Sequence, residues 1–128
     1  MKRMIRRQTG FSLIEILIGL ILLGIGLLAL AGLMVTSVKG NFFSNNLTQA
    51  TYFAQERLEV LKNAAFSSAQ NSVGDHNEPS ATVPGSTLVF NRAYTVADNG
   101  DGSRTITYTV TWNDGVAHSI TFSTIKSP

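Results

Sequence analysis

The chain has 128 residues, a length that allows one domain with a separate anchor and excludes a large multidomain enzyme. Its formal net charge of +2 comes from the N-terminal end, because four of the ten basic residues lie in the first ten positions. Residues 11–128 carry six basic and eight acidic residues. The charge therefore indicates no nucleic-acid partner, and the absence of cysteine excludes disulfides and thiolate sites.

The first predicted element is an apolar run from Ile16 to Val35, twenty residues without a charge. As a helix it would span about 30 Å, the thickness of the hydrocarbon core of a bilayer. Because the basic cluster precedes the run, we expect residues 1–10 to stay in the cytoplasm and the remainder to cross the membrane. A signal peptide cut at residues 29–31 is the alternative, but the run is longer than the usual h-region of about 7–15 residues.

Glu15 lies at the start of this apolar segment. A carboxylate in hydrocarbon costs on the order of 2.5–3.5 kcal/mol on insertion scales, so it needs a cation or a route to water by snorkelling. Glu15 is therefore a candidate functional residue.

The stretch GFSLIEILIGLILLGIGLLALAGL, residues 10–33, resembles the N-terminus of the type IV pilin and type II secretion pseudopilin superfamily. The signature of that superfamily is a short basic leader, a glycine, a phenylalanine, a small hydroxyl residue, two apolar residues and a glutamate. Gly10 to Glu15 fit it position by position, and the segment GLLALAGL is most similar to minor pilins.

The resemblance implies that prepilin peptidase cuts between Gly10 and Phe11 and methylates the new amine of Phe11. An α-amine is largely protonated near neutral pH, so Glu15 would neutralise it on a neighbouring subunit as a filament grows, or on its own chain if the helix begins at once. The implied partners are the peptidase, other pilin subunits through helix packing, and an inner-membrane assembly platform.

Three glycines of the apolar segment, Gly24, Gly26 and Gly32, each weaken a helix by roughly 1 kcal/mol relative to alanine. They either let neighbouring helices approach closely or allow local loss of helical order, and glycine is also an ordinary component of membrane helices. We assign these positions to helix packing or flexibility.

Residues 36–66 predict an amphipathic helix that continues the transmembrane helix of residues 11–35, because apolar residues recur there at three- and four-residue spacing. Glu56 and Glu59 lie three residues apart, but no second constellation accompanies them, so we expect a solvated face and no catalytic site.

Residues 67–86 are rich in Ser, Asn, Gly and Pro and predict a long connection. Asp75, His76 and Glu78 on this segment would make a poor metal site, since one histidine with nearby acids on a loop is not preformed. The later segment DNGDG, residues 98–102, is expected to be a hairpin turn rather than a calcium loop.

Residues 87–128 predict a three-stranded antiparallel meander, since bulky residues alternate with polar ones. Parity then sets the register: a three-residue loop at 113–115 places Trp112 opposite Val116, and a five-residue loop at 98–102 places Tyr94 opposite Ile106. All bulky residues share one face. Arg92 on that face either reaches the edge of the core or meets Glu56 or Glu59.

The predicted fold class is α+β: one long N-terminal helix packed on a three-stranded antiparallel meander, with residues 36–128 forming one globular head. This arrangement agrees with the pilin fold. The predicted function is that of a minor pilin precursor, a structural subunit with no enzymatic activity and no cofactor, held in the bacterial inner membrane with its N-terminus cytoplasmic and then built into a surface pilus. A minor pseudopilin in a periplasmic pseudopilus is the nearest alternative, and a signal-cleaved or membrane-anchored binding module is the alternative of another class.

Overall fold

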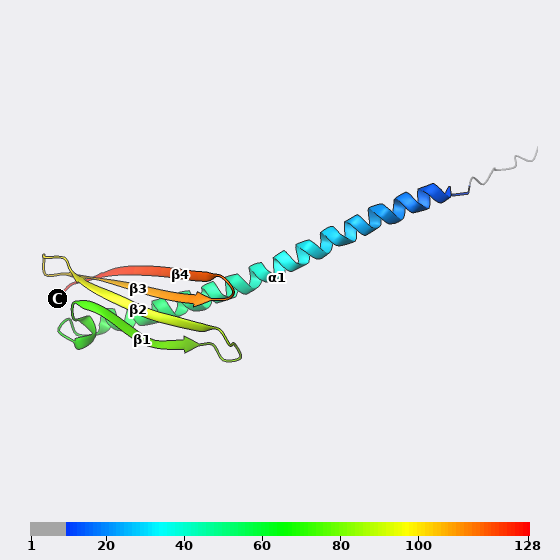
Figure 1. Ribbon diagram of the computed structural model, residues 1–128. Coiled ribbons are helices and arrows are strands. Elements are labelled where there is room, and N and C mark those ends of the chain that lie inside the picture. The colour runs from blue at the N-terminus through cyan, green and yellow to red at the C-terminus, as the bar shows by residue number, and fades with distance from the viewer. Residues whose placement is uncertain (1–9) are drawn as a thin grey trace, which may run out of the picture. The chain divides into compact units, whose positions relative to one another are not determined.

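The computed structural model describes residues 10–128, so the predicted leader lies outside the described residues except for Gly10. The elements in chain order are the helix α1 (Leu13–Asn63), the 3-10 turn η1 (Ala69–Asn71) and the strands β1 (Gly74–Thr82), β2 (Val89–Asp98), β3 (Arg104–Asn113) and β4 (Ala117–Lys126) (Figure 1). The chain divides into two compact units, one ending at Phe42 and the other running from Phe43 to Pro128.

The first unit is the N-terminal part of α1, and every described residue in it is exposed. By length and composition α1 can cross a membrane, and none of its most apolar window is buried. The predicted apolar helix is therefore present, and it continues without a break through residues 36–46.

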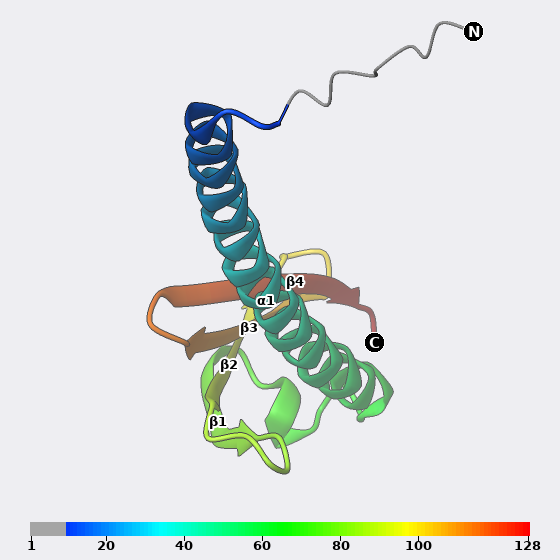
Figure 2. The ribbon, with the colours of Figure 1, turned by 90° about the vertical axis from the view of Figure 1, so that its right-hand side faces the viewer.

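The second unit contains an antiparallel sheet in the order β1-β2-β3-β4, with the C-terminal part of α1 packed across one face (Figure 2). Ala50, Ala54 and Leu61 of α1 are fully buried against the sheet. The sheet contributes large buried side chains, namely Phe90, Tyr94, Val96, Ile106, Tyr108, Val110 and Trp112. Small alanines on the helix leave room for these bulky side chains, and the predicted α+β arrangement is confirmed.

The sheet has four strands rather than three, because β1 forms inside the segment predicted to be a loop, residues 67–86. Its sequence, GDHNEPSAT, contains no run of apolar residues, and no residue of β1 is fully buried. An edge strand needs little apolar content, since only one of its sides is paired and its faces are partly solvated. Pro79 lies where the pairing of β1 with β2 shifts, between Glu78 and Ala81, as expected for proline in an edge strand.

Both later hairpin loops have the predicted length, but each begins one residue further along the chain. The last pairs are Asp98 with Arg104 and Asn113 with Ala117, so the loops are residues 99–103 and 114–116. The side chains of Asp98 and Asn113 explain the shift, because each accepts a hydrogen bond from the backbone N–H two residues later, at 2.8 and 2.9 Å. These side chains start the turn while their backbones still belong to the strand.

The one-residue shift changes the partners across the sheet and keeps the faces. Trp112 lies opposite His118 rather than Val116, and Tyr94 lies opposite Tyr108 rather than Ile106. Because each pairing moved by two positions, the bulky residues still share the face that α1 covers. Gly115, in the loop of residues 114–116, has a positive φ of 109°, a conformation that favours glycine.

Candidate functional site

The predicted cleavage site lies in a short extended segment directly before α1. Gly10 and Phe11 are not helical, and the Phe11 side chain is 80% exposed. The helix starts where the carbonyl of Ser12 accepts hydrogen bonds from the backbone N–H groups of Glu15 and Ile16, at 3.0 and 3.3 Å. The Gly10–Phe11 peptide bond is therefore exposed and free of helical hydrogen bonds, as a peptidase requires.

Glu15 lies in the first turn of α1, where a carboxylate interacts favourably with the helix dipole. Within residues 10–128 it has no cationic partner. Because α1 begins at Leu13, Phe11 is not part of the helix, and the four-residue spacing from Phe11 to Glu15 does not bring the two together on one helical face. Among the described residues of one chain, Glu15 is thus left without a charge partner.

The apolar side chains that follow Glu15 are exposed all around the helix. Examples are Leu20, Leu23 and Leu28, with exposed fractions of 59%, 58% and 76%. Leaving such surface in water is unfavourable by about 25 cal/mol per Å², so this part of α1 requires lipid or other apolar helices around it.

Residues 5–31 match the family model described as the Prokaryotic N-terminal methylation motif. The chain carries a prepilin-type signal. No curated protein and no solved structure matches the chain. The signal supports a type IV pilin or pseudopilin precursor, and therefore a structural subunit that prepilin peptidase processes and that assembles with other pilin subunits. With the apolar helix, it is consistent with anchoring in the inner membrane.

The prepilin signal contains Gly10, Phe11, Glu15, Gly24 and Gly26, whereas Gly32 lies just beyond the match. Gly24, Gly26 and Gly32 are exposed, and a Cβ atom added at any of them would meet nothing within 4 Å beyond the backbone of its own helix turn. No contact within the described chain therefore requires glycine there. The helix continues unbroken through these positions, so their role in packing between helices or in flexibility stays a prediction.

Beyond the prepilin signal, three residues weighed as metal ligands lie on β1 and have separate partners. Asp75 accepts a hydrogen bond from the Thr95 hydroxyl at 2.8 Å, and the His76 ring stacks on Tyr94 with centroids 4.6 Å apart. The Glu78 carboxylate turns to the core side. Among residues 10–128, no group of three His, Asp or Glu side chains is placed to hold a metal.

Glu78 is the centre of a half-buried network that the sequence did not predict. Its carboxylate pairs with the Arg57 guanidinium of α1 and accepts a hydrogen bond from the Tyr108 hydroxyl at 2.6 Å. Burial, and next the hydrogen bond to Glu78, raise the pKa of Tyr108 well above its ordinary value. Arg92 meets neither Glu56 nor Glu59; it donates to the Pro79 carbonyl at 2.8 Å, and both glutamates are exposed as expected.

Two basic side chains of the sheet fasten the C-terminal end of α1. Lys126 donates to the carbonyls of Leu61 and Ala64 at 3.0 and 2.6 Å, and also to that of Lys62. Arg104 donates to the carbonyl of Phe66 at 3.0 Å and lies over the Phe66 ring. Cations are favourable at a helix C-terminus, where the last carbonyls have no helical partners.

These charged residues share a signal that parity reasoning could have used. Glu78, Arg92, Arg104 and Lys126 are all even-numbered, as are the core residues of β2 to β4. A charge on the core face of a strand needs a partner there. For Glu78, Arg104 and Lys126 the partner lies on α1 or on the connection that follows it, whereas Arg92 bonds to Pro79 of β1.

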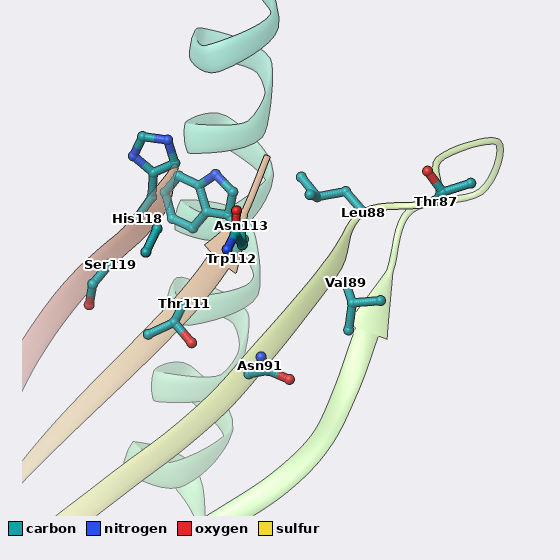
Figure 3. A pocket seen from close by; sticks show the side chains of 10 residues that line it. Thr87, Leu88, Val89, Asn91, Thr111, Trp112, Asn113, His118 and Ser119 are labelled. Carbon is teal, nitrogen blue, oxygen red and sulfur yellow. The ribbon is translucent and has the colours of Figure 1, made fainter. Parts of the chain in front are cut away.

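A cavity of about 560 Å³ opens where β2 begins and β3 ends (Figure 3). Its walls contain no Asp, Glu, Lys or Arg and include Leu88, Asn91, Thr111, Trp112 and His118. The His118 Nε2 atom lies 2.9 Å from a carboxylate oxygen of Asp114, outside the walls of the cavity. Burial alone would raise the pKa of Asp114, but hydrogen bonds from Asn46 and His118 hold it below its ordinary value. These hydrogen bonds thus hold the turn between β3 and β4 in place.

Proposed function

We propose that the chain is the precursor of a minor type IV pilin. Prepilin peptidase cuts it between Gly10 and Phe11 and methylates Phe11, and the mature subunit enters the filament through α1. One observation carries this proposal: within the motif match, an exposed Gly10–Phe11 bond is followed by a lone carboxylate, Glu15, in the first turn of an exposed apolar helix.

Cleavage supplies the charge that Glu15 lacks. It converts the backbone nitrogen of Phe11 into an amine that is largely protonated near neutral pH. The amine and the carboxylate are each costly in hydrocarbon, so pairing them between neighbouring subunits favours one axial register of the helices. Since the helix of the uncut chain begins beyond Phe11, the pairing between subunits is the one that the geometry favours.

The rest of the molecule serves this assembly role. The subunit waits in the bacterial inner membrane with its N-terminus in the cytoplasm, contacts an assembly platform there, and is displayed in a surface pilus. Gly24, Gly26 and Gly32 lie on the part of α1 that would face neighbouring helices, and their missing side chains would permit close approach. A minor pseudopilin would be processed and packed in the same way and would stay in a periplasmic pseudopilus.

The test is the intact mass and N-terminal sequence of the protein from cells with and without prepilin peptidase. We expect a chain starting at Phe11 with one added methyl group, and an uncut chain when the peptidase is missing. Gly10→Val should block cleavage, because the added side chain crowds the cut bond, whereas the matched Gly19→Val should be cut normally.

Two results would overturn the proposal. A chain starting after residue 31, or an uncut chain in cells that contain the peptidase, would indicate the secreted or anchored binding module instead. Recovery of the cut chain in sheared surface filaments supports the pilus, and its retention in the periplasm together with a secretion defect on deletion indicates the pseudopilus.

A further inference from the structure

The outer edge of β4 is unpaired, and it lacks the features that usually block pairing with another strand. All ten residues of β4 pair with β3 without a shift, and no strand within residues 10–128 pairs with its other side. Edge strands usually carry lysine, proline or a bulge that prevents further pairing. β4 has neither proline nor bulge, and its single lysine, Lys126, is turned to the carbonyls of α1. The strand is therefore a template for another strand.

The opposite edge of the sheet, the outer side of β1, is regular over its first five residues. Gly74 to Glu78 pair with β2 in an unbroken ladder, and the irregularity begins only at Pro79. The two edges lie on opposite sides of the sheet (Figure 1).

The number of strands decides how such edges can meet. In a four-stranded antiparallel meander, β1 and β4 run in opposite directions. When two copies stand side by side in the same orientation, β4 of one therefore faces β1 of the next as an antiparallel neighbour. Antiparallel pairing of β4 with another β4 would need one copy turned over, which reverses its α1. Copies anchored through α1 in one membrane share one orientation, and this step rests on the proposed function.

The side chains at the two edges match across such a junction. On the rung that runs through Tyr94 and Tyr108, β1 contributes His76 and β4 contributes Phe122. Both side chains lie on the core face and are only half-buried, because nothing in the described chain covers them from the side. Level pairing places the His76 ring beside Phe122 of the neighbouring copy, an aromatic cross-strand contact.

A second match lies three rungs further, at the end of the sheet. Val73 directly precedes β1 and is 56% exposed, and Ile125 of β4 is 66% exposed. Ile125 lies level with Thr105 and Ala97, and the observed ladder of β1 begins one rung before this level, at Gly74. Level pairing therefore brings Val73 near Ile125 of the neighbouring copy at this end of the sheet, which shields both aliphatic side chains from water.

We propose that neighbouring copies of this chain join their sheets through antiparallel pairing of β4 with β1 of the next copy. The contact joins two different surfaces, so it repeats along a row of subunits and leaves a free edge at each end. A single short ladder buries less surface than a stable interface of about 1,200–2,000 Å². It forms between copies that α1 already holds at high local concentration.

Engineered cysteines test this pairing, because the chain has none of its own. Asn77 of β1 and Thr121 of β4 are exposed on the outer face and lie on one rung. Paired residues of antiparallel strands have Cα atoms about 4.5–5.5 Å apart, within disulfide range. Within one copy three strand spacings of about 4.8 Å separate the two positions, which is too far for a disulfide.

Membranes containing the full-length variants would be oxidised and analysed without reductant. We expect Asn77→Cys/Thr121→Cys to give a ladder of dimers, trimers and larger species, and each single variant to stay monomeric. Two differently tagged single variants, expressed together, should form only mixed dimers. The control Ala97→Cys/Thr121→Cys, with an exposed cysteine on the same face of inner strand β2, should give no ladder. Emission of Trp112, 3% exposed, reports that each variant is folded.

Absence of the ladder in a folded double variant would overturn the proposal, and dimers of Thr121→Cys alone would replace it with pairing between two β4 strands. The N-terminus is determined on the same samples. A cut and methylated chain without a ladder contradicts the sheet pairing only, whereas a ladder formed by an uncut chain contradicts the proposed processing only.

Discussion

Two carboxylates of this chain, Glu15 and Glu78, lie in surroundings that disfavour charge and differ in where their partners come from. Glu78 is paired within the molecule, by Arg57 and the Tyr108 hydroxyl. Glu15 lies at the start of an exposed apolar helix, and within residues 10–128 no cation reaches it. Glu78 therefore stabilises the fold, whereas Glu15 remains available for a contact between chains.

Replacing Glu15 by leucine should separate insertion from assembly. We expect Glu15→Leu to enter the membrane and to be cut at Gly10, since an apolar side chain suits the bilayer better than a carboxylate. Its recovery in sheared filaments should fall at least tenfold, because the charge pair with the neighbouring Phe11 amine is lost. Quantitative immunoblots of the membrane and filament fractions measure both steps. The matched variant Glu59→Leu, at an exposed position, should assemble normally, and filament recovery of Glu15→Leu equal to the wild type would remove the assembly role of Glu15.

The raised pKa of Tyr108 makes stability fall in alkali. A tyrosine in the unfolded chain ionises near pH 10, whereas the buried Tyr108, bonded to Glu78, keeps its proton to higher pH. The contribution of Tyr108 to the free energy of unfolding is thus fully present below about pH 10 and declines as the pH rises above that value. Tyr108→Phe should destabilise the fold by about 1.5–3 kcal/mol at pH 8, through the lost bond to a charged group, and by less at pH 11.

Urea unfolding followed by Trp112 emission measures this difference at the two pH values. Tyr52→Phe is the control, because Tyr52 is 59% exposed and should show no change at either pH. If Tyr108→Phe lowered the free energy of unfolding as much at pH 11 as at pH 8, the Tyr108 hydroxyl would not keep its proton to a higher pH than an ordinary tyrosine.

Among the elements, the C-terminal end of α1 depends on a strand far along the chain. A helix leaves its last carbonyls without partners, and here Lys126 of β4 donates to two of them, those of Leu61 and Lys62, and to the carbonyl of Ala64 just past the helix end. These hydrogen bonds therefore hold the C-terminal end of α1 against the sheet.

Lys126→Met should therefore weaken the second unit although the substitution keeps the apolar stem. We expect a loss of about 1–3 kcal/mol, from the carbonyl bonds and the interaction with the helix dipole. Lys62→Met is the control at the same helix end, because the Lys62 side chain is exposed. Urea titration of the detergent-solubilised full-length chain gives both values, and equal midpoints for the two variants would contradict the fastening role.

Substitutions at Gly26 distinguish close packing from flexibility in the apolar part of α1. The space beside Gly26 is open to an added Cβ atom, and the position is exposed, so both the alanine and the leucine variant should insert and be cut. If glycine serves close approach of helices, alanine should be tolerated and leucine should lower filament recovery several-fold. If it serves local unwinding, alanine should lower recovery as well, since it stabilises the helix by roughly 1 kcal/mol. Filament recovery of both variants at the wild-type level would contradict both roles.

Sequence patterns predicted the elements whose apolar content repeats and missed those held by polar contacts. The periodicity of α1 and the alternation of β2 to β4 come from burial, which leaves a regular mark in the sequence. β1 is held by its backbone pairing with β2 and by the contacts of Glu78, and neither of these requires apolar residues. The hairpin registers depend on where Asp98 and Asn113 start their turns, and alternation alone cannot distinguish registers two residues apart.

The same distinction holds for the candidate site. The cleavage segment and Glu15 follow from residues adjacent in the chain, so the motif alone locates them. The partners of Glu78 and Lys126 lie on other elements, and only the three-dimensional structure shows which donors and acceptors meet.

At the scale of the whole molecule, burial and membrane character belong to different parts of the chain. Every buried residue of the described chain lies between Asn46 and Lys126, within the unit that begins at Phe43. The described residues before it are all exposed. The packed core therefore does not depend on the apolar segment.

A fragment of residues 43–128 should consequently fold by itself. We expect a soluble protein with cooperative urea unfolding and blue-shifted Trp112 emission, since all residues around that side chain are retained. A fragment starting at residue 55 is the control; it lacks Ala50 and Ala54 and should not unfold cooperatively. Non-cooperative unfolding of the longer fragment would show that the apolar segment is needed for the core.

The fastening of α1 by Lys126 also sets a delay during synthesis. The lysine lies 62 residues after Ala64, whose carbonyl it satisfies. At a translation rate of about 5–20 residues per second, the ribosome needs roughly 3–12 s to make the intervening chain. During that interval the end of the helix is already made while its cap does not yet exist. We therefore expect the last turn of α1 to stay frayed until β4 has been made, and the contacts of Lys126 to be among the last to form as the second unit folds.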